Sequence, residues 1–269
     1  MTWWEAALLG LIQGITEFLP VSSSGHLVLV QHLLGLEIDN ITFEVFVHFG
    51  TVLSIATVYR VRILEIVRGV WEGVHRPGRI GAQYRSNRDF RFAIFILLSM
   101  IPGGVMYILF REPLEAAFSA PHLTAGMLLV TGALLLLTRI RPHPAGDISA
   151  WKSIVTGVAQ GLAMIPGISR SGATICAALY QNVRPAQAVA FSFLMSVPVI
   201  TGATGIEAIR IAQAGDITNL LPILLGTLVA YASGVWAIRT VIHFVKQGNL
   251  AWFAYYCFLV GGLGLWWWL

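Results

Sequence analysis

The hydrophobic and polar positions of the chain form long apolar stretches separated by short polar segments. Six of these stretches approach the roughly 20 residues that a helix needs to cross a bilayer. They cover residues 41–59, 90–110, 122–139, 186–211, 219–240 and 250–268. The pattern predicts an all-α polytopic membrane protein with six transmembrane helices.

Two further apolar stretches, 3–36 and 151–181, are interrupted in the middle. Pro20 interrupts the first and Pro166-Gly167 the second, and serines and a glycine follow each interruption. Because proline ends a helix and serine is a preferred N-cap, each stretch is expected to form a helix, a break and a second helix. We expect each pair to turn back within the membrane as a re-entrant helix pair.

The two interrupted stretches resemble each other in sequence. Residues 13–27 read QGITEFLPVSSSGHL and residues 160–174 read QGLAMIPGISRSGAT. At one constant offset the matching positions are Gln13 with Gln160, Gly14 with Gly161, Val21 with Ile168, Ser22 with Ser169, Ser24 with Ser171 and Gly25 with Gly172. Each copy opens a half that continues with three spans, about 1–140 and 151–269 of a single membrane domain (1–269). An odd number of spans between the copies inverts the second copy, which predicts an inverted-topology repeat.

The composition excludes an ordinary soluble domain. Of the 269 residues, 57% are hydrophobic and 11% are charged, and the mean hydropathy is +0.75, whereas a soluble domain carries about a quarter charged residues. The start, MTWWEAALLG, has no basic region before its apolar residues, so a removable signal peptide is not expected. Cys176 and Cys257 lie in apolar surroundings, which favours packing over a disulfide framework or a zinc site.

The charges indicate the sidedness of the chain. The net charge is +4, but Lys and Arg form no recognisable nucleic-acid module, so no nucleic-acid partner is expected. They gather in three segments, 60–91, 139–152 and 239–246. The positive-inside rule places these segments on the cytoplasmic side. The opposite segments are short and hold Arg111, Glu112, Glu115, Arg210 and Asp216.

If the two breaks face each other near mid-membrane, two helix N-termini converge there. Such termini offer unpaired N–H groups and partial positive charge, which suit an anion. Residues 22–24 add three hydroxyls to one terminus, and residues 169–171 add two hydroxyls and a guanidinium to the other. Arg170 is the strongest single indication, because an arginine inside an apolar segment is costly in lipid and usually faces a polar interior. The expected ligand of this site is a phosphate or a diphosphate.

The polar residues of the two breaks also allow a purely structural interpretation, which stays open beside the functional one. Ser22 and Ser24 would serve equally well as helix caps. Glu17 and Arg170 would also form an ion pair whose only role is to hold helices together. The choice depends on what surrounds them in the folded chain.

His26 and His48 are two of the histidines in the apolar segments. A lone buried histidine is more often structural than catalytic, but His26 lies close in sequence to Ser23 and Glu17, which favours a function. Glu44 and His48 are four residues apart on one predicted helix. We interpret them as a helix-packing pair.

Together these residues resemble a known family, the undecaprenyl-diphosphate phosphatases of the bacitracin-resistance type. The stretch QGITEFLPVSSSGH fits the first signature of that family, PGISRSGAT at 166–174 fits the second, and the resemblance covers nearly the whole chain. It implies hydrolysis of undecaprenyl diphosphate to undecaprenyl phosphate on the outer (periplasmic) side of the bacterial cytoplasmic (inner) membrane. This reaction recycles the lipid carrier of cell-wall synthesis. The implied fold has six spanning helices and two re-entrant pairs in an inverted repeat.

The resemblance also assigns roles to residues. The acidic residue of the family falls on Glu17, its serine on Ser23, its histidine on His26 and its arginine on Arg170, which form the implied catalytic set. The implied substrate-binding positions are Ser22, Ser24, Gly25, Ser169, Ser171, Gly172 and Thr174. The nucleophile stays open between Ser23, His26 and a water molecule.

The resemblance further implies a divalent cation, Mg²⁺ or Ca²⁺. Gln13 stands where many members of the family have a second glutamate. One carboxylate fewer is therefore available for the cation. We assign the cation to Glu17, with Gln13 as the weaker candidate ligand.

Two other functions share parts of this pattern. The acid-phosphatase-like lipid phosphatases share the pattern Ser24-Gly25-His26 and Ser169-Arg170, but they need a further histidine that residues 171–183 lack. A transporter or flippase for an anionic isoprenyl lipid would use the same inverted repeat and broken helices. Phosphate release in detergent would separate hydrolysis from transport. The sequence leaves open whether the chain forms a homodimer and which isoprenyl chain lengths it accepts.

Overall fold

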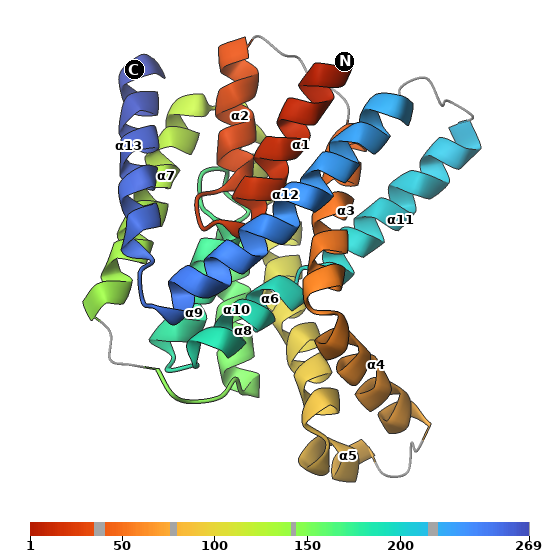
Figure 1. Cartoon of the computed structure of the whole chain (residues 1–269). Coiled ribbons are helices and arrows are strands. Elements are labelled where there is room, and N and C mark those ends of the chain that lie inside the picture. Colours follow the sequence, from red (N-terminus) through yellow and green to blue (C-terminus); the bar gives the residue numbers. More distant parts are fainter. Residues whose placement is uncertain (35–40, 76–79, 141–143, 215–219, 269) are drawn as a thin grey trace.

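The computed structural model describes residues 1–34, 41–75, 80–140, 144–214 and 220–268 (Figure 1). Within these ranges the chain is helical and contains no β-sheet. The first half holds α1 (Trp3–Phe18), α2 (Ser23–Leu34), α3 (Ile41–Val58), α4 (Arg60–Val74), α5 (Ile80–Ser86), α6 (Arg88–Ala117), α7 (Pro121–Leu137) and a 3-10 turn (Thr138–Ile140). The second half holds α8 (Ala150–Leu162), α9 (Arg170–Tyr180), α10 (Pro185–Leu194), α11 (Val197–Ala214), α12 (Leu220–Lys246) and α13 (Ala251–Trp268).

Four helical segments among the described residues are long and apolar enough to cross a membrane. They are Arg88–Ala117, Pro121–Ile140, Pro185–Gln213 and Leu220–Lys246. The bent pair of α3 and α4, whose axes differ by 86°, adds a fifth if it counts as one span. The prediction of an all-α, multi-pass membrane protein is confirmed. Six transmembrane helices stay a prediction, because α13 is not among these candidate spans and α3 is among them only together with α4.

Both interrupted stretches fold as a helix, a break and a second helix, as predicted. The first break covers residues 19–22 and the second covers residues 163–169. Pro20 has no backbone N–H with which to continue α1, and Ser22 has a left-handed backbone with φ of 72°. In the second break Gly167 has φ of 93°, a conformation that glycine adopts without steric cost. Each break therefore turns at residues suited to leaving a helix.

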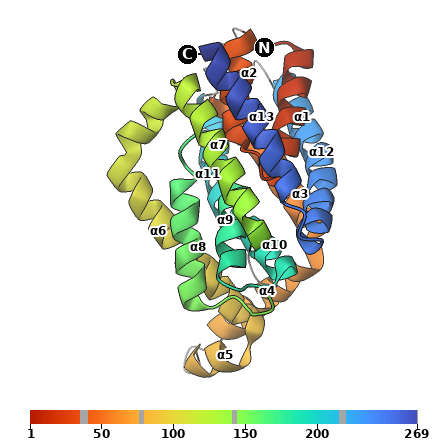
Figure 2. The same ribbon diagram turned by 90° about the vertical axis from the view of Figure 1, so that its left-hand side faces the viewer.

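The basic segment 60–91 lies almost entirely outside the predicted spans, and the structure shows that it is largely helical. α4, α5 and the first turn of α6 occupy most of it, and they project from the end of the molecule away from both termini (Figures 1 and 2). Gly69 and Gly73 of α4 are buried against Phe90 of α6. The missing side chains let the two helices approach closely, so packing on α6 stabilises a helix in a segment rich in arginine.

Long helices pack in pairs around the two breaks. α1 lies along α12, α8 along α6, and α7 along α13 (Figures 1 and 2). Gly10 and Gly14 of α1 face the backbone of α12, while Gly157 and Gly161 of α8 face α6. The offset that relates the two breaks also relates Gly10 to Gly157 and Gly14 to Gly161. Small residues at these positions permit the close packing that membrane helices use in place of a hydrophobic driving force.

Candidate active site

Ser22 of the first break makes hydrogen bonds with the first turn of α2. Ser22 Oγ accepts a hydrogen bond from the N–H of Gly25 at 3.2 Å, and the Ser22 carbonyl accepts from the N–H of His26 at 3.1 Å. Ser22 is therefore the N-cap of α2. Its left-handed backbone is a conformation that costs an ordinary residue about 1–2 kcal/mol, so the cap and its surroundings must hold it.

The second break repeats these contacts. Ser169 Oγ accepts from the N–H of Gly172 at 3.0 Å, and the Ser169 carbonyl accepts from the N–H of Ala173 at 2.8 Å. In the first copy the hydroxyls of Ser22 and Ser24 lie 3.4 Å apart, and in the second the matching hydroxyls lie 3.2 Å apart. Positions that match in sequence thus make matching hydrogen bonds.

The two breaks contact each other in a reciprocal way. A Cβ atom added to Gly25 would lie 3.1 Å from the Cα of Gly167 in the second break. A Cβ atom added to Gly172 would lie 3.3 Å from the Cβ of Pro20 in the first break. The repeat offset relates Gly25 to Gly172 and also Pro20 to Gly167. The N-termini of α2 and α9 therefore converge, as the sequence predicts.

Glu17 is the centre of the polar cluster at this junction. Its side chain is only 6% exposed, and one carboxylate oxygen accepts from the Ser23 hydroxyl at 2.6 Å and from the Gln13 amide at 2.9 Å. The other oxygen pairs with the guanidinium of Arg170 from the second copy. The structure thus brings together Glu17, Ser23 and Arg170, three of the four residues of the implied catalytic set.

Arg170 reaches this cluster from the first turn of α9. Its side chain is 22% exposed, so part of the guanidinium is accessible beyond the ion pair. Arginine donors that are not used by a carboxylate are available to a phosphate. The structural and the functional interpretation of the sequence both include an ion pair between Arg170 and Glu17. An accessible guanidinium and a serine hydroxyl on the same carboxylate are features that a purely structural pair does not need.

His26 is held by groups that the sequence does not point to. Its Nδ1 lies 2.8 Å from the Ser22 carbonyl, and its Nε2 lies 2.8 Å from the hydroxyl of Tyr256 in α13. Because a carbonyl only accepts, Nδ1 carries a proton, and in the neutral ring Nε2 accepts from the Tyr256 hydroxyl. Ser22 and Tyr256, rather than Glu17, therefore orient the ring of His26.

His48 joins the cluster from α3. Its Nδ1 donates to the Glu44 carbonyl at 2.7 Å, and its Nε2 lies 3.9 Å from the Glu17 carboxylate. The interpretation of Glu44 and His48 as a helix-packing pair is therefore incomplete, because His48 faces the candidate site. The available signal was the presence of two ionisable residues inside a predicted span, where such groups are costly and often functional.

Two of the predicted substrate-binding residues, Thr174 and Ser171, make hydrogen bonds that hold α9 in place. Thr174 is 1% exposed, and its hydroxyl bonds to the Arg170 carbonyl and the Ser192 hydroxyl. The Ser171 hydroxyl donates to the carbonyl of Leu19 in the first break at 3.3 Å. These hydroxyls tie α9 to its neighbours. Substrate binding by Thr174 and Ser171 stays a prediction.

Gln13 and Glu17 offer oxygen atoms that suit a divalent cation. The amide nitrogen of Gln13 donates to Glu17, while Gln13 Oε1 is buried and has no hydrogen-bond partner within the described part of the chain. An orphaned amide oxygen beside a carboxylate fits Mg²⁺, which commonly takes one or two protein oxygens and completes its shell with phosphate and water. Over the same residues no group of three or more His, Cys, Asp and Glu forms a metal cage. The donors therefore fit a cation that arrives with a phosphate.

The arrangement combines an anion site with a hydroxyl held by a carboxylate. Two converging helix N-termini and a guanidinium stabilise negative charge, and Ser23 lies within hydrogen-bond reach of Glu17. Phosphoryl transfer depends mainly on such positioning and charge stabilisation.

Comparison with known proteins agrees with this geometry. Residues 6–263 match the family described as bacitracin resistance protein BacA. The chain is 58% identical to an undecaprenyl-diphosphatase of Salinibacter ruber over 99% of both chains. It is 39% identical to undecaprenyl-diphosphatases of Desulfatibacillum aliphaticivorans, over 97% of both chains, and of Halothermothrix orenii, over 96% of this chain and 95% of the relative. The resemblance carried by the two signatures is confirmed, and the chain belongs to the bacitracin resistance protein BacA family.

Proposed function

We propose that this protein hydrolyses undecaprenyl diphosphate to undecaprenyl phosphate and inorganic phosphate. The observation that carries the proposal is the buried Glu17, which binds Ser23 of its own copy and Arg170 of the other copy. The names of the relatives supply the substrate, because each is an undecaprenyl-diphosphatase that matches along nearly its whole length. The protein is thus a membrane hydrolase that regenerates the lipid carrier of cell-wall synthesis.

The reaction follows from the positions of these groups. Arg170 and the N–H groups that begin α2 and α9 hold the diphosphate. Ser23 Oγ attacks the terminal phosphorus and its proton passes to Glu17. The bond from that phosphorus to the bridging oxygen breaks, and undecaprenyl phosphate leaves with the electron pair. Water then attacks the phosphorus of the phosphoserine, the bond from phosphorus to Ser23 Oγ breaks, and Oγ takes the proton back from Glu17 as inorganic phosphate leaves.

His26 contributes to this scheme as a positioning residue. Both of its ring nitrogens are engaged, by the Ser22 carbonyl and the Tyr256 hydroxyl. It therefore links the cap of α2 to α13 and holds the turn on which Ser23 lies. A phosphoserine trapped on Ser23 supports this assignment, whereas a phosphohistidine on His26 would contradict it.

A divalent cation, Mg²⁺ or Ca²⁺, is part of the proposal. Glu17 and Gln13 would hold it together with the phosphate oxygens, and when bound it offsets the negative charge of the diphosphate. Loss of phosphate release in the presence of a chelator, with recovery on adding Mg²⁺ or Ca²⁺, is the expected result.

The proposal includes the topology. Six spans and two re-entrant pairs form an inverted repeat, and the site opens on the outer side of the cytoplasmic membrane. The matched caps and the matched glycines of α1 and α8 support it, as does the gathering of basic residues in three segments. Cysteines introduced by His75→Cys and Glu115→Cys should be labelled from opposite sides of intact cells. Labelling of both from one side would overturn this topology.

Phosphate release from undecaprenyl diphosphate by the purified protein in detergent tests the function itself. Wild type should release phosphate, and Ser23→Ala should release little. Arg111→Ala and Glu115→Gln are matched controls, because they break an exposed ion pair with a separation of 2.7 Å outside the site. Detergent removes the compartments that a transporter needs, so folded protein without phosphate release would favour the flippase instead.

A further inference from the structure

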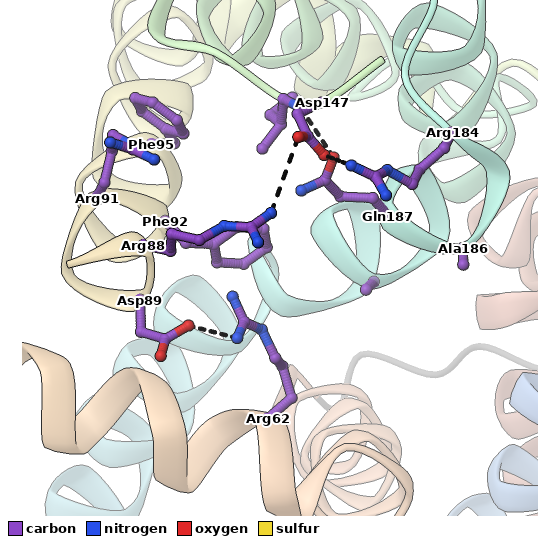
Figure 3. A pocket seen from close by; sticks show the side chains of 12 residues that line it. Arg62, Arg88, Asp89, Arg91, Phe92, Phe95, Asp147, Arg184, Ala186 and Gln187 are labelled. Carbon is purple, nitrogen blue, oxygen red and sulfur yellow. Dashed lines mark hydrogen bonds and ion pairs between the residues drawn. The ribbon is translucent and has the colours of Figure 1, made fainter. Parts of the chain in front are cut away.

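A cavity lies among α4, α6, α10 and the segment that precedes α8, apart from the candidate active site (Figure 3). Its volume is about 520 Å³, and none of the residues that line it belongs to the candidate active site. It is built from the predicted cytoplasmic segments 60–91 and 139–152 together with the start of α10. The cavity is therefore separate from the phosphatase site.

The charged groups that line this cavity are unequal in number. Four guanidiniums and two carboxylates face it, from Arg62, Arg88, Arg91, Arg184, Asp89 and Asp147. Asp147 forms ion pairs with two arginines. Its carboxylate pairs with Arg184, and one of its oxygens lies 3.8 Å from the Arg88 guanidinium (Figure 3). Arg91 bonds to backbone carbonyls at 3.3 Å and to none of these carboxylates. Arg62 contacts Asp89 and also pairs at 2.9 Å with Glu65, which lies outside the cavity lining, so one positive charge is in excess and an anion would balance it.

The cavity also has an apolar wall and a helix N-terminus. Phe92 and Phe95 are only 4% and 5% exposed, and the Arg62 guanidinium lies 4.8 Å from the centre of the Phe92 ring. Ala186 lines the cavity in the first turn of α10, whose N-cap makes no side-chain hydrogen bond. Pro185 has no N–H and the N–H of Gln187 donates to the Arg184 carbonyl at 3.0 Å, so this N-terminus adds the N–H of Ala186 as a donor for a phosphate. Basic groups above apolar side chains suit an anion that also has an apolar part.

We propose that this cavity binds a phosphate group, carried by an anionic phospholipid of the membrane leaflet on the basic side. Basic pockets between helices on the cytoplasmic side are the usual places where anionic lipid headgroups bind. Inorganic phosphate shares the chemistry of the headgroup and is the alternative source.

The outer face of α4 favours the lipid as the source. Val61, Leu64, Val67, Trp71 and Val74 form a stripe along this helix, and each is between 58% and 68% exposed. α4 turns by 86° from α3, so it leaves the direction of that span. An amphipathic helix with basic residues and an exposed apolar stripe is typical of contact with the membrane interface. Arg62 of the same helix lines the cavity.

The experiment compares two double variants of the full-length protein in non-ionic detergent. Arg88→Ala/Arg184→Ala removes two cavity charges, and Arg60→Ala/Arg68→Ala removes two exposed charges of α4 that lie outside this cavity. The thermal unfolding temperature is followed while dioctanoyl phosphatidylglycerol, dioctanoyl phosphatidylcholine or inorganic phosphate is added. The cavity variant should need at least about tenfold more phosphatidylglycerol for half of the effect, while the control variant should match wild type.

A third variant guards against simple misfolding. Asp147→Asn removes the carboxylate that competes for the arginines, so it should bind phosphatidylglycerol more tightly than wild type. A response of wild type to inorganic phosphate that the cavity variant loses would support the site with free phosphate as the source. The proposal is overturned if neither anion stabilises wild type, if phosphatidylcholine stabilises it as well as phosphatidylglycerol does, if both double variants lose the response equally, or if the phosphatidylglycerol response survives unchanged in the cavity variant.

Discussion

The two breaks have the same framework and different chemistry. Both cap a helix with a serine and place a glycine three residues later, and each glycine lies against the other break. At the offset that relates the copies, however, Glu17 corresponds to Met164, and Ser23 corresponds to Arg170. The first copy therefore supplies the carboxylate and the hydroxyl, and the second supplies the guanidinium.

This comparison indicates which residues build the framework and which ones the proposed mechanism uses. Ser22 and Ser169 make the same cap hydrogen bond in both copies, although the backbone is left-handed at Ser22 and extended at Ser169, so capping accounts for both serines and substrate binding by them stays a prediction. Glu17, Ser23 and Arg170 have no counterpart of the same type, yet they meet in one cluster. What the copies share builds the junction, and what they do not share supplies the groups that the proposed mechanism uses.

The largest effect should come from Glu17. Glu17→Gln removes the charge that binds Ser23 and Arg170, so kcat/KM should fall by about 10²–10³-fold. Met164→Leu at the matching position should leave kcat/KM near the wild-type value, because the two side chains are similar in volume. A comparable loss in both variants would show that the two copies do not differ in the way we describe.

Arg170→Lys should have the next largest effect. Lysine keeps the positive charge but loses the planar donor fork, so kcat/KM should fall by roughly 10–100-fold. Arg139→Lys, on the exposed segment that follows α7, is the matched control and should change little. Steady-state phosphate release at several substrate concentrations measures both. Full activity of Arg170→Lys would argue against bidentate binding of a phosphate.

Gly25→Ala and Gly172→Ala test the shared framework. Each new Cβ would press on the opposite break at 3.1 and 3.3 Å, which should destabilise the fold by about 1–3 kcal/mol. Gly104→Ala is the control, because a Cβ there meets nothing within 4 Å. Thermal unfolding in detergent measures all three variants. A large loss in one copy and none in the other would contradict a reciprocal contact.

The smallest effects should come from the caps. Ser22→Ala and Ser169→Ala each remove one cap hydrogen bond, at a cost of about 1 kcal/mol in the free energy of unfolding. The two losses should be similar, and kcat/KM should change far less than in Glu17→Gln. If Ser22→Ala were stable but inactive, Ser22 would belong to the chemistry rather than to the framework.

The sequence predicts the junction better than its surroundings. Pro20, the serines and the repeated motif indicate both breaks and their meeting, because these signals are local and occur twice. His48 and Tyr256 reach the site from α3 and α13 through tertiary packing, and no motif or repeat includes them. The helix α4 is missed because its stability depends on packing against α6, which a run of arginines does not reveal.

The central claim is that Glu17 of one copy and Arg170 of the other act as one site. A double-mutant cycle tests it directly, with phosphate release measured for wild type, Glu17→Gln, Arg170→Ala and the double variant. We expect the double variant to lose about as much activity as either single variant, because residues in one network are strongly non-additive. Losses that multiply, or substantial activity in the double variant, would contradict the account.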